Sequence, residues 1–239
     1  MKYLDLTLPT PEENLACDEA LMDVSEGGGT EEVLRFWEPR EHFVVAGYSN
    51  KIRSEVYLDF CRAAKIPVLR RCTGGGTILQ GPGCLNYSLV LRLDRASELR
   101  SITNTNRYIL DRHQRALEPL AGSGIRVTGT TDLALGALKF SGNAQRRKKH
   151  SLLFHGTFLF DFDIPLISRC LAMPSKQPAY RRTRPHEEFL TNLGLPGAAL
   201  KQALRKAWGA AQTMKKIPVE RIAALVREKY SKDEWNFKF

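Results

Sequence analysis

The stretch that most constrains this chain runs from Arg70 to Ser88, RRCTGGGTILQGPGCLNYS, and carries five glycines and two arginines between two apolar runs. Three of the glycines are consecutive: Gly74, Gly75 and Gly76. Because they lack Cβ atoms, their N–H groups can approach an anion or a flat ring closely. The flanking segments IPVL and LNYSLVLRL are typical of strands. We therefore expect a glycine-rich loop at the rim of a sheet, with a plain connector as the alternative.

This loop does not follow the common phosphate-binding patterns. A P-loop needs a Lys-Ser or Lys-Thr pair after the glycines, and a dinucleotide-binding loop needs G-x-G-x-x-G before a helix; neither is present. Arg70 and Arg71, directly upstream, carry forked donors that suit phosphate. Since neighbouring strand residues point to opposite faces, we expect only one of the two to face a site. The alternative for the pair is a solvated strand edge.

Composition narrows the class of protein. The chain has 239 residues, 43% of them hydrophobic, which is enough for a full core. Its formal charge of +10 favours an anionic substrate or partner. We expect no secretory signal and no membrane span. Five scattered cysteines without a C-x-x-C pair argue against a disulfide framework or a metal site, so we expect a cytoplasmic protein with no resident metal.

The order of apolar patterns predicts one domain over residues 1–239, of the α/β (α+β) class. Residues 12–25 and 104–120 have helical spacing, residues 52–64 are typical of a short helix, and Pro119 is expected to end the second long helix. The segments around 33–39, 42–49, 85–93 and 125–135 are typical of strands. Residues 136–163 read as a hairpin with a basic tip. Three prolines make residues 174–185 an irregular basic segment, and residues from about 186 to 239 are predicted to be helical.

A second group of candidate site residues lies in this hairpin. Lys139 stands among apolar and small residues, including Ser141 and Gly142, so its ammonium is a candidate clamp for a carboxylate or an acyl phosphate. A surface lysine is the alternative. His155 is a candidate site residue or a core histidine. The run RRKKH at 146–150 is a solvated tip or a basic docking surface.

Three motifs in order, RRCTGGGTILQGPGCLNYS, GTTDLALGALKFSGNAQRR and LLFHGTFLFDFD, resemble the catalytic domain of lipoate-protein ligase A, within the superfamily of biotin/lipoate ligases and octanoyltransferases. NLACDEALM and LRFWEP extend the resemblance, which covers roughly residues 12–175. The resemblance implies a biotin/lipoate ligase-like fold, with a mixed, largely antiparallel sheet flanked by helices. It also implies a two-step ligase reaction: lipoate and ATP give lipoyl-AMP and pyrophosphate, and the lipoyl group then passes to a lysine of an acceptor lipoyl domain.

The resemblance also implies roles for single residues. Lys139 would grip the lipoyl carboxylate and the α-phosphate as the catalytic residue, with Mg²⁺ on the phosphates. The remaining residues implied in substrate and nucleotide binding, with Arg71 on a phosphate and Asp132 near adenine, are Arg71, Gly74, Gly75, Gly76, Thr77, Ile78, Leu79, Asp132, Ser141, Gly142 and His155. Lipoate or a short acyl acid would be the small substrate, and neither nucleic acid nor a membrane is expected as a partner.

The chain departs from the family pattern at three places. Gln80 and Cys84 stand where ligases of this family often have a histidine and an asparagine, and Phe154 replaces the first of two histidines before Gly156. Little beyond a few helices can be built after residue 186, so the small C-terminal domain of the longest ligases is shortened or missing. Because some reduced relatives need a separate protein for adenylation, an accessory ligase subunit is a candidate partner.

Two other functions stay open on the sequence. An octanoyl- or lipoyltransferase would pass the acyl group through a cysteine thioester without ATP, and that chemistry needs a reactive thiolate near Lys139. Residues 85–169 contain no cysteine, which leaves Cys84 and Cys170 as the thiols to consider. A noncatalytic basic binding protein is the third function, but its clusters lack interleaved aromatic residues. The sequence favours the ligase.

Overall fold

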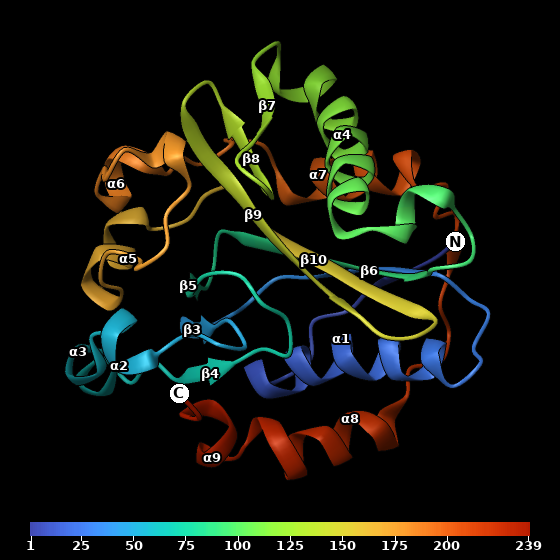
Figure 1. Ribbon diagram of the computed structural model, residues 1–239, viewed down its shortest axis with the longest axis horizontal. Coiled ribbons are helices and arrows are strands. Elements are labelled where there is room, and N and C mark those ends of the chain that lie inside the picture. The colour runs from blue at the N-terminus through green and yellow to red at the C-terminus, as the bar shows by residue number, and fades with distance from the viewer.

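The computed structural model describes residues 1–239 as two sheets with helices on both sides (Figure 1). The larger sheet has eight strands in the order β11-β1-β2-β6-β10-β9-β8-β7, and the smaller has three in the order β4-β3-β5. The strands are β1 (Lys2–Asp5), β2 (Val33–Trp37), β3 (Phe43–Ala46), β4 (Val68–Arg70), β5 (Ile78–Gln80), β6 (Cys84–Arg92), β7 (Ile125–Thr128), β8 (Asp132–Leu135), β9 (Leu138–Arg147), β10 (Ser151–Leu159) and β11 (Gln212–Thr213).

Most strand pairs are antiparallel. The exceptions are β1 with β2, β1 with β11 and β3 with β4, which are parallel. The helices are α1 (Pro11–Glu26), α2 (Ile52–Glu55), α3 (Leu58–Ala63), α4 (Ile102–Ala121), α5 (Ile164–Cys170), α6 (His186–Phe189), α7 (Gly197–Ala207), α8 (Val219–Leu225) and α9 (Asp233–Asn236). The predicted mixed, largely antiparallel α/β fold is confirmed.

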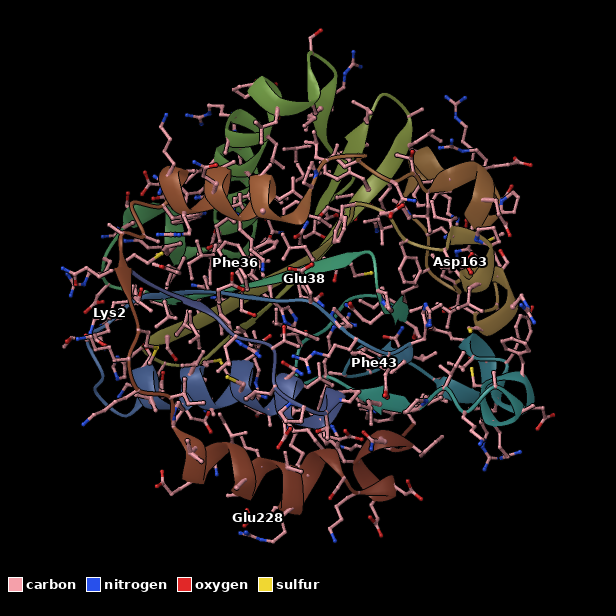
Figure 2. All side chains as sticks on the ribbon, turned by 180° about the vertical axis from the view of Figure 1, so that it is seen from behind. Lys2, Phe36, Glu38, Phe43, Asp163 and Glu228 are labelled. Atoms are coloured by element: carbon pink, nitrogen blue, oxygen red, sulfur yellow. The ribbon has the colours of Figure 1, made fainter.

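The two faces of the larger sheet pack against different helices. Along β6, Leu85, Tyr87, Leu89 and Leu91 join the core under α4 and α7, whereas Val90 joins the core under α1 and α8. This is the alternation expected of a strand that is covered on both faces. Figure 2 shows Phe36 in the first of these layers, with α7 crossing above it. A third core packs the smaller sheet against α2, α3 and α5.

Local sequence signals explain where the long helices begin. Thr10 accepts from the N–H of Glu13, and the Glu13 carboxylate accepts from the N–H of Thr10, a capping box that starts α1 together with Pro11 in the first turn. The Ser101 hydroxyl caps α4. Pro119 was expected to end α4, but the helix continues through it to Ala121; a proline so close to the end costs only one intrahelical hydrogen bond.

Three further expectations need adjustment. A short strand, β5, lies within the glycine-rich stretch and pairs with β3. The predicted helix over residues 52–64 is split into α2 and α3 around Val56. The C-terminal segment contains α6 to α9 together with non-helical stretches, and the short strand β11 between α7 and α8 extends the larger sheet beside β1. No helix is both long and apolar enough to cross a membrane.

Candidate active site

A cavity of about 450 Å³ lies where the two sheets face each other. The smaller sheet contributes β5 and the loop before it, and the larger sheet contributes β6, β8, β9 and β10. The segment from Leu171 to Leu190 supplies another wall. Of the twelve predicted site residues, Gly74 alone does not line the cavity; the eleven that do are Arg71, Gly75, Gly76, Thr77, Ile78, Leu79, Asp132, Lys139, Ser141, Gly142 and His155.

Arg71 holds the glycine-rich loop in shape. Its Nη2 lies 2.5 Å from the carbonyl oxygen of Gly74 and 2.8 Å from that of Gly76. Its side chain is buried, and this burial lowers the pKa of Arg71 to about 10, so the guanidinium stays charged at neutral pH. Gly75 has a φ of +87°, and a Cβ there would lie 2.8 Å from Arg71 Nη2. A residue with a side chain would therefore be strained at Gly75 and crowd Arg71.

Arg70 points the other way, as the alternation of the strand predicts. It does not line the cavity, and its side chain is fully buried. The alternative of a solvated strand edge is therefore wrong for both arginines. Arg70 donates to backbone carbonyl groups of residues 47–50 and of the C-terminal tail, Trp235–Phe239.

A bulge in the sheet brings Lys139 onto the cavity face. Asp132 pairs with Gly142, but the register shifts between Leu133 and Ala134, so that Ala134 pairs with Lys139. Since side chains alternate along a strand, residues 139 and 142 would otherwise point to opposite faces; the extra residue in β9 puts them on the same one. Lys139 Nζ lies 2.8 Å from Asp132 Oδ1. A Cβ on Gly142 would lie 2.9 Å from that Nζ, so glycine leaves room for the ammonium.

Asp132 has a second partner. The hydroxyl of Tyr180 donates to Asp132 Oδ2 at 2.8 Å. Burial first, and then the charge of Asp132, raise the pKa of Tyr180 well above its ordinary value, so the phenol keeps its proton. The irregular segment 174–185 is thus tied to β8 across the cavity.

His155 belongs to a polar network that runs into the glycine-rich loop. Its Nε2 lies 2.7 Å from Thr73 Oγ1, which accepts from Arg71 Nε at 3.0 Å. Its Nδ1 lies 3.4 Å from Asp18 Oδ2. Asp18 in turn forms a buried ion pair of 2.5 Å with Arg35. Burial would raise the pKa of Asp18, but the charge of Arg35 and the contact with His155 outweigh it and lower that pKa, so Asp18 is ionised.

The departures from the family pattern lie in two settings. Gln80 exchanges hydrogen bonds with Asn86 and donates to Thr157 Oγ1 at 2.7 Å, which makes a neutral polar group on the cavity wall. Cys84 is fully buried and does not reach the cavity. Phe154 packs in the core beside Tyr87.

None of the five cysteines lines the cavity, and all of them are buried. Burial raises the pKa of Cys17 and Cys72 to about 11 and that of Cys84 and Cys170 to about 12. It also raises the pKa of Cys61. At neutral pH these side chains are thiols rather than thiolates.

The basic tip of the hairpin does not present a set of free cations. Arg146 pairs with Glu19 at 2.9 Å, and Lys148 pairs with Asp23 at 2.6 Å, both on α1. Arg147 donates to the carbonyl oxygen of Leu99. Lys149 and His150 are exposed, so the tip is partly paired with α1 and partly solvated.

Several cavity residues were not found from the sequence. They include a buried carboxylate, Glu55, which accepts from the Thr77 hydroxyl, and Asn143, which accepts from the Tyr87 hydroxyl. No local signal distinguished them, since each was one polar residue within a predicted helix or strand. The others that carry polar side chains are Asp18, Asn86, Tyr87, Thr130, Thr131, Thr157, Lys176, Gln177, Arg181 and His186.

Comparison with known proteins identifies a family and several relatives. Residues 10–207 match the family described as the lipoyl protein ligase A/B catalytic domain. Octanoyltransferase LipM of Clostridioides difficile is 32% identical over 63% of this chain and 62% of its own length. Octanoyltransferase LipM of Symbiobacterium thermophilum is 30% identical over 96% of this chain and 95% of its own length. Lipoate-protein ligase A subunit 1 of Thermoplasma acidophilum is 29% identical over 93% of this chain and 90% of its own length.

Several solved lipoate ligases share this fold. One from T. acidophilum with bound lipoic acid superposes with a TM-score of 0.81 at 25% identity and covers both chains fully. A bi-partite lipoate protein ligase with its E2 lipoyl domain, from the same organism, gives a TM-score of 0.81 at 25% identity over 99% of this chain and 96% of that one. A lipoate-protein ligase A bound with ATP gives a TM-score of 0.80 at 26% identity and covers 99% of each chain. The matched family is the one that the three sequence motifs resemble.

Proposed function

Since the chain belongs to the lipoyl protein ligase A/B catalytic domain family, an enzyme family of lipoate ligases and octanoyltransferases, we propose that it is an ATP-dependent lipoate-protein ligase. It would join lipoate to AMP with release of pyrophosphate, and then pass the lipoyl group from lipoyl-AMP to a lysine of an acceptor lipoyl domain. The relatives named LipM make the octanoyltransferase the second candidate.

The observation that favours the ligase is the position of the thiols. A transferase that works through a thioester needs a thiolate within reach of the acyl group. Here no cysteine lines the cavity, and burial raises the pKa of every thiol. An acyl-adenylate needs no enzyme nucleophile, because the lipoate carboxylate itself attacks the α-phosphorus.

Lys139 is the proposed catalytic residue. The attack brings a carboxylate against a phosphate, and these two anions repel each other. A cation fixed between them offsets the repulsion and the negative charge that develops on the phosphoryl oxygens. The ion pair with Asp132 and the bulge in β9 hold the ammonium on the cavity face. One carboxylate oxygen forms the new bond to phosphorus, and the bond to the pyrophosphate oxygen breaks.

The other predicted residues would shape the binding site. Arg71, Gly75, Gly76 and Thr77 are proposed to enclose the acyl chain and the phosphate, and Asp132 to lie near adenine. Lipoic acid and ATP are bound in the solved relatives, which supports both as substrates here. The structure contains no group of three or more His, Cys, Asp or Glu side chains placed to hold a metal ion. We therefore propose that Mg²⁺ enters on the phosphates of ATP.

Two protein partners are proposed from the relatives. One relative is named as subunit 1 of a ligase, and another is described as bi-partite and with its E2 lipoyl domain. This chain is similar to each over at least nine-tenths of its length. A second subunit that supports adenylation and an acceptor lipoyl domain are therefore the proposed partners. We propose that residues 1–239 form one catalytic unit. We also propose that it works in the cytoplasm, since a reducing compartment keeps cysteines unpaired, as all five are here.

The test separates the two half-reactions. Purified protein is given chemically made lipoyl-AMP and a lipoyl domain, and the domain is weighed by mass spectrometry. Because this step follows adenylation, it needs no second subunit. We expect the wild-type protein to lipoylate the domain. A rate of lipoylation no higher than the rate without enzyme would contradict the proposal.

A further inference from the structure

The C-terminal tail, Trp235–Phe239, caps the free edge of the strand that leads into the glycine-rich loop. β4 is an edge strand, and the N–H and carbonyl groups of Arg70 point away from its neighbour β3. Asn236 Oδ1 accepts from Arg70 N at 3.0 Å, and Trp235 Nε1 donates to Arg70 O at 2.8 Å. Two side chains thus take the place of a further strand. Figure 1 shows α9 and the C-terminal end beside β4.

The Arg70 side chain connects this tail to a second loop. Its Nε lies 3.1 Å from the carbonyl oxygens of both Trp235 and Asn236. Its Nη1 lies 2.8–3.0 Å from the carbonyl oxygens of Gly47, Tyr48 and Asn50. A fully buried guanidinium with no carboxylate partner depends on such acceptors, because a buried charge without them is costly. Removing part of the set therefore disturbs the rest.

The loop of residues 47–50 packs directly against the glycine-rich loop. Tyr48 N donates to Thr73 O at 2.8 Å. A Cβ on Gly47 would overlap the carbonyl oxygen of Gly75, so the two loops are in direct contact. Asn50 Nδ2 lies 3.2 Å from Thr77 Oγ1. Contacts therefore run without a gap from the tail through Arg70 and residues 47–50 to residues 73–77.

We propose that Trp235 and Asn236 are positioning residues for the glycine-rich loop, although they lie beyond residue 207, where the match to the family ends. They touch no cavity-lining residue through their own hydrogen bonds; they act through Arg70. The consequence for the loop depends on the contacts alone. The consequence for catalysis, weaker binding of ATP and lipoate, rests on the proposed function.

The test uses conservative changes in the tail with a neighbour as the control. Trp235→Phe keeps an aromatic ring and removes the Nε1–H donor, and Asn236→Ala removes the acceptor of Arg70 N. Phe237→Ala is the matched control, since Phe237 is exposed and makes no hydrogen bond with Arg70. Amide hydrogen exchange is followed by mass spectrometry in peptides that cover residues 73–77 and β10. We expect exchange of residues 73–77 to be about fivefold to tenfold faster in the two variants, with β10 unchanged, and no change in the control.

Kinetics supply a second readout. Pyrophosphate release, with the second subunit added where it is needed, should show a higher KM for ATP in the variants and a kcat within about twofold of wild type, as expected when only binding is weakened.

Each outcome bears on one of the two proposals. Unchanged exchange of residues 73–77 in both variants would overturn the positioning role, and so would equal acceleration in β10, which would mean that the tail stabilises the whole fold. A wild-type protein that makes no lipoyl-AMP would instead contradict the proposed function, and the exchange data would still decide on the tail.

Discussion

The ammonium of Lys139 lies 2.8 Å from Oδ1 of Asp132, on the cavity side of a bulge between β8 and β9. This contact fixes the position of the Lys139 ammonium on the cavity face of β9. It also leaves the lysine partly exposed, at 24% of its side-chain surface, so that a substrate can reach it.

The first prediction concerns this charge. Lys139→Ala should lower the rate of lipoyl-AMP formation by about 10²- to 10³-fold, the usual effect of removing one charge-stabilising donor. The rate is measured as pyrophosphate release that depends on lipoate. Lys149→Ala, at an exposed lysine of the hairpin turn, is the control and should keep the wild-type rate. An active Lys139→Ala protein would remove Lys139 from the mechanism.

The second prediction concerns the segment over the cavity. Tyr180→Phe removes the hydrogen bond to Asp132, which should lower the free energy needed to open residues 174–185 by about 1 kcal/mol. Trypsin should then cut at Arg182 about fivefold faster than in the wild type. Tyr57→Phe, at a tyrosine that is 50% exposed, is the matched control. Equal cleavage rates in Tyr180→Phe and wild type would show that this bond does not hold the segment.

The third prediction concerns pH and stability. Burial, with a smaller effect of Arg112, lowers the pKa of His113 from 6.5 to about 3, and Trp208 Nε1 donates to its ring. Between these values the unfolded chain binds a proton that the folded protein does not. The free energy of unfolding should therefore fall as the pH drops from about 6.5 to 3, by up to about 1.4 kcal/mol per pH unit from this residue.

His113→Gln should flatten that part of the profile, as measured by urea unfolding at a series of pH values. The control is His150→Gln, because His150 is exposed in the turn after β9. Parallel profiles for His113→Gln and wild type would contradict the assignment.

The fourth prediction concerns the thiols. Cys84→Ala and Cys170→Ala should each retain acyl transfer to the lipoyl domain within about threefold of wild type, because neither side chain reaches the cavity. Folded protein should also react slowly with iodoacetamide, since burial raises the pKa of all five thiols. Loss of transfer in one variant that still folds would identify an acyl-carrying cysteine.

Part of the site was predictable because its signals are local. The glycine-rich loop and Lys139 stand in short motifs, and all the predicted cavity residues except Gly74 line the cavity. Strand alternation also separated Arg71 from Arg70 correctly. The fold class followed from hydrophobic spacing, which depends on neighbours in the sequence.

The remaining features depend on contacts between distant segments. Asp18 is one of several acidic residues in α1, and its role comes from Arg35 and His155, 17 and 137 positions away. The bulge that turns Lys139 toward the cavity arises from pairing with β8, which spacing within β9 does not reveal. Similarly, the acidic partners that α1 supplies to Arg146 and Lys148 of the basic tip come from a distant segment.

The measurement that tests the central claim most directly compares two acyl donors in one protein. Wild-type protein is incubated with lipoyl-AMP or with an octanoyl thioester, each with and without a lipoyl domain, and both proteins are weighed by mass spectrometry. The ligase account predicts a modified domain with lipoyl-AMP and no acyl group on any cysteine of this chain. Modification from the thioester alone, with an acyl-enzyme trapped on a cysteine, would contradict it and establish the transferase.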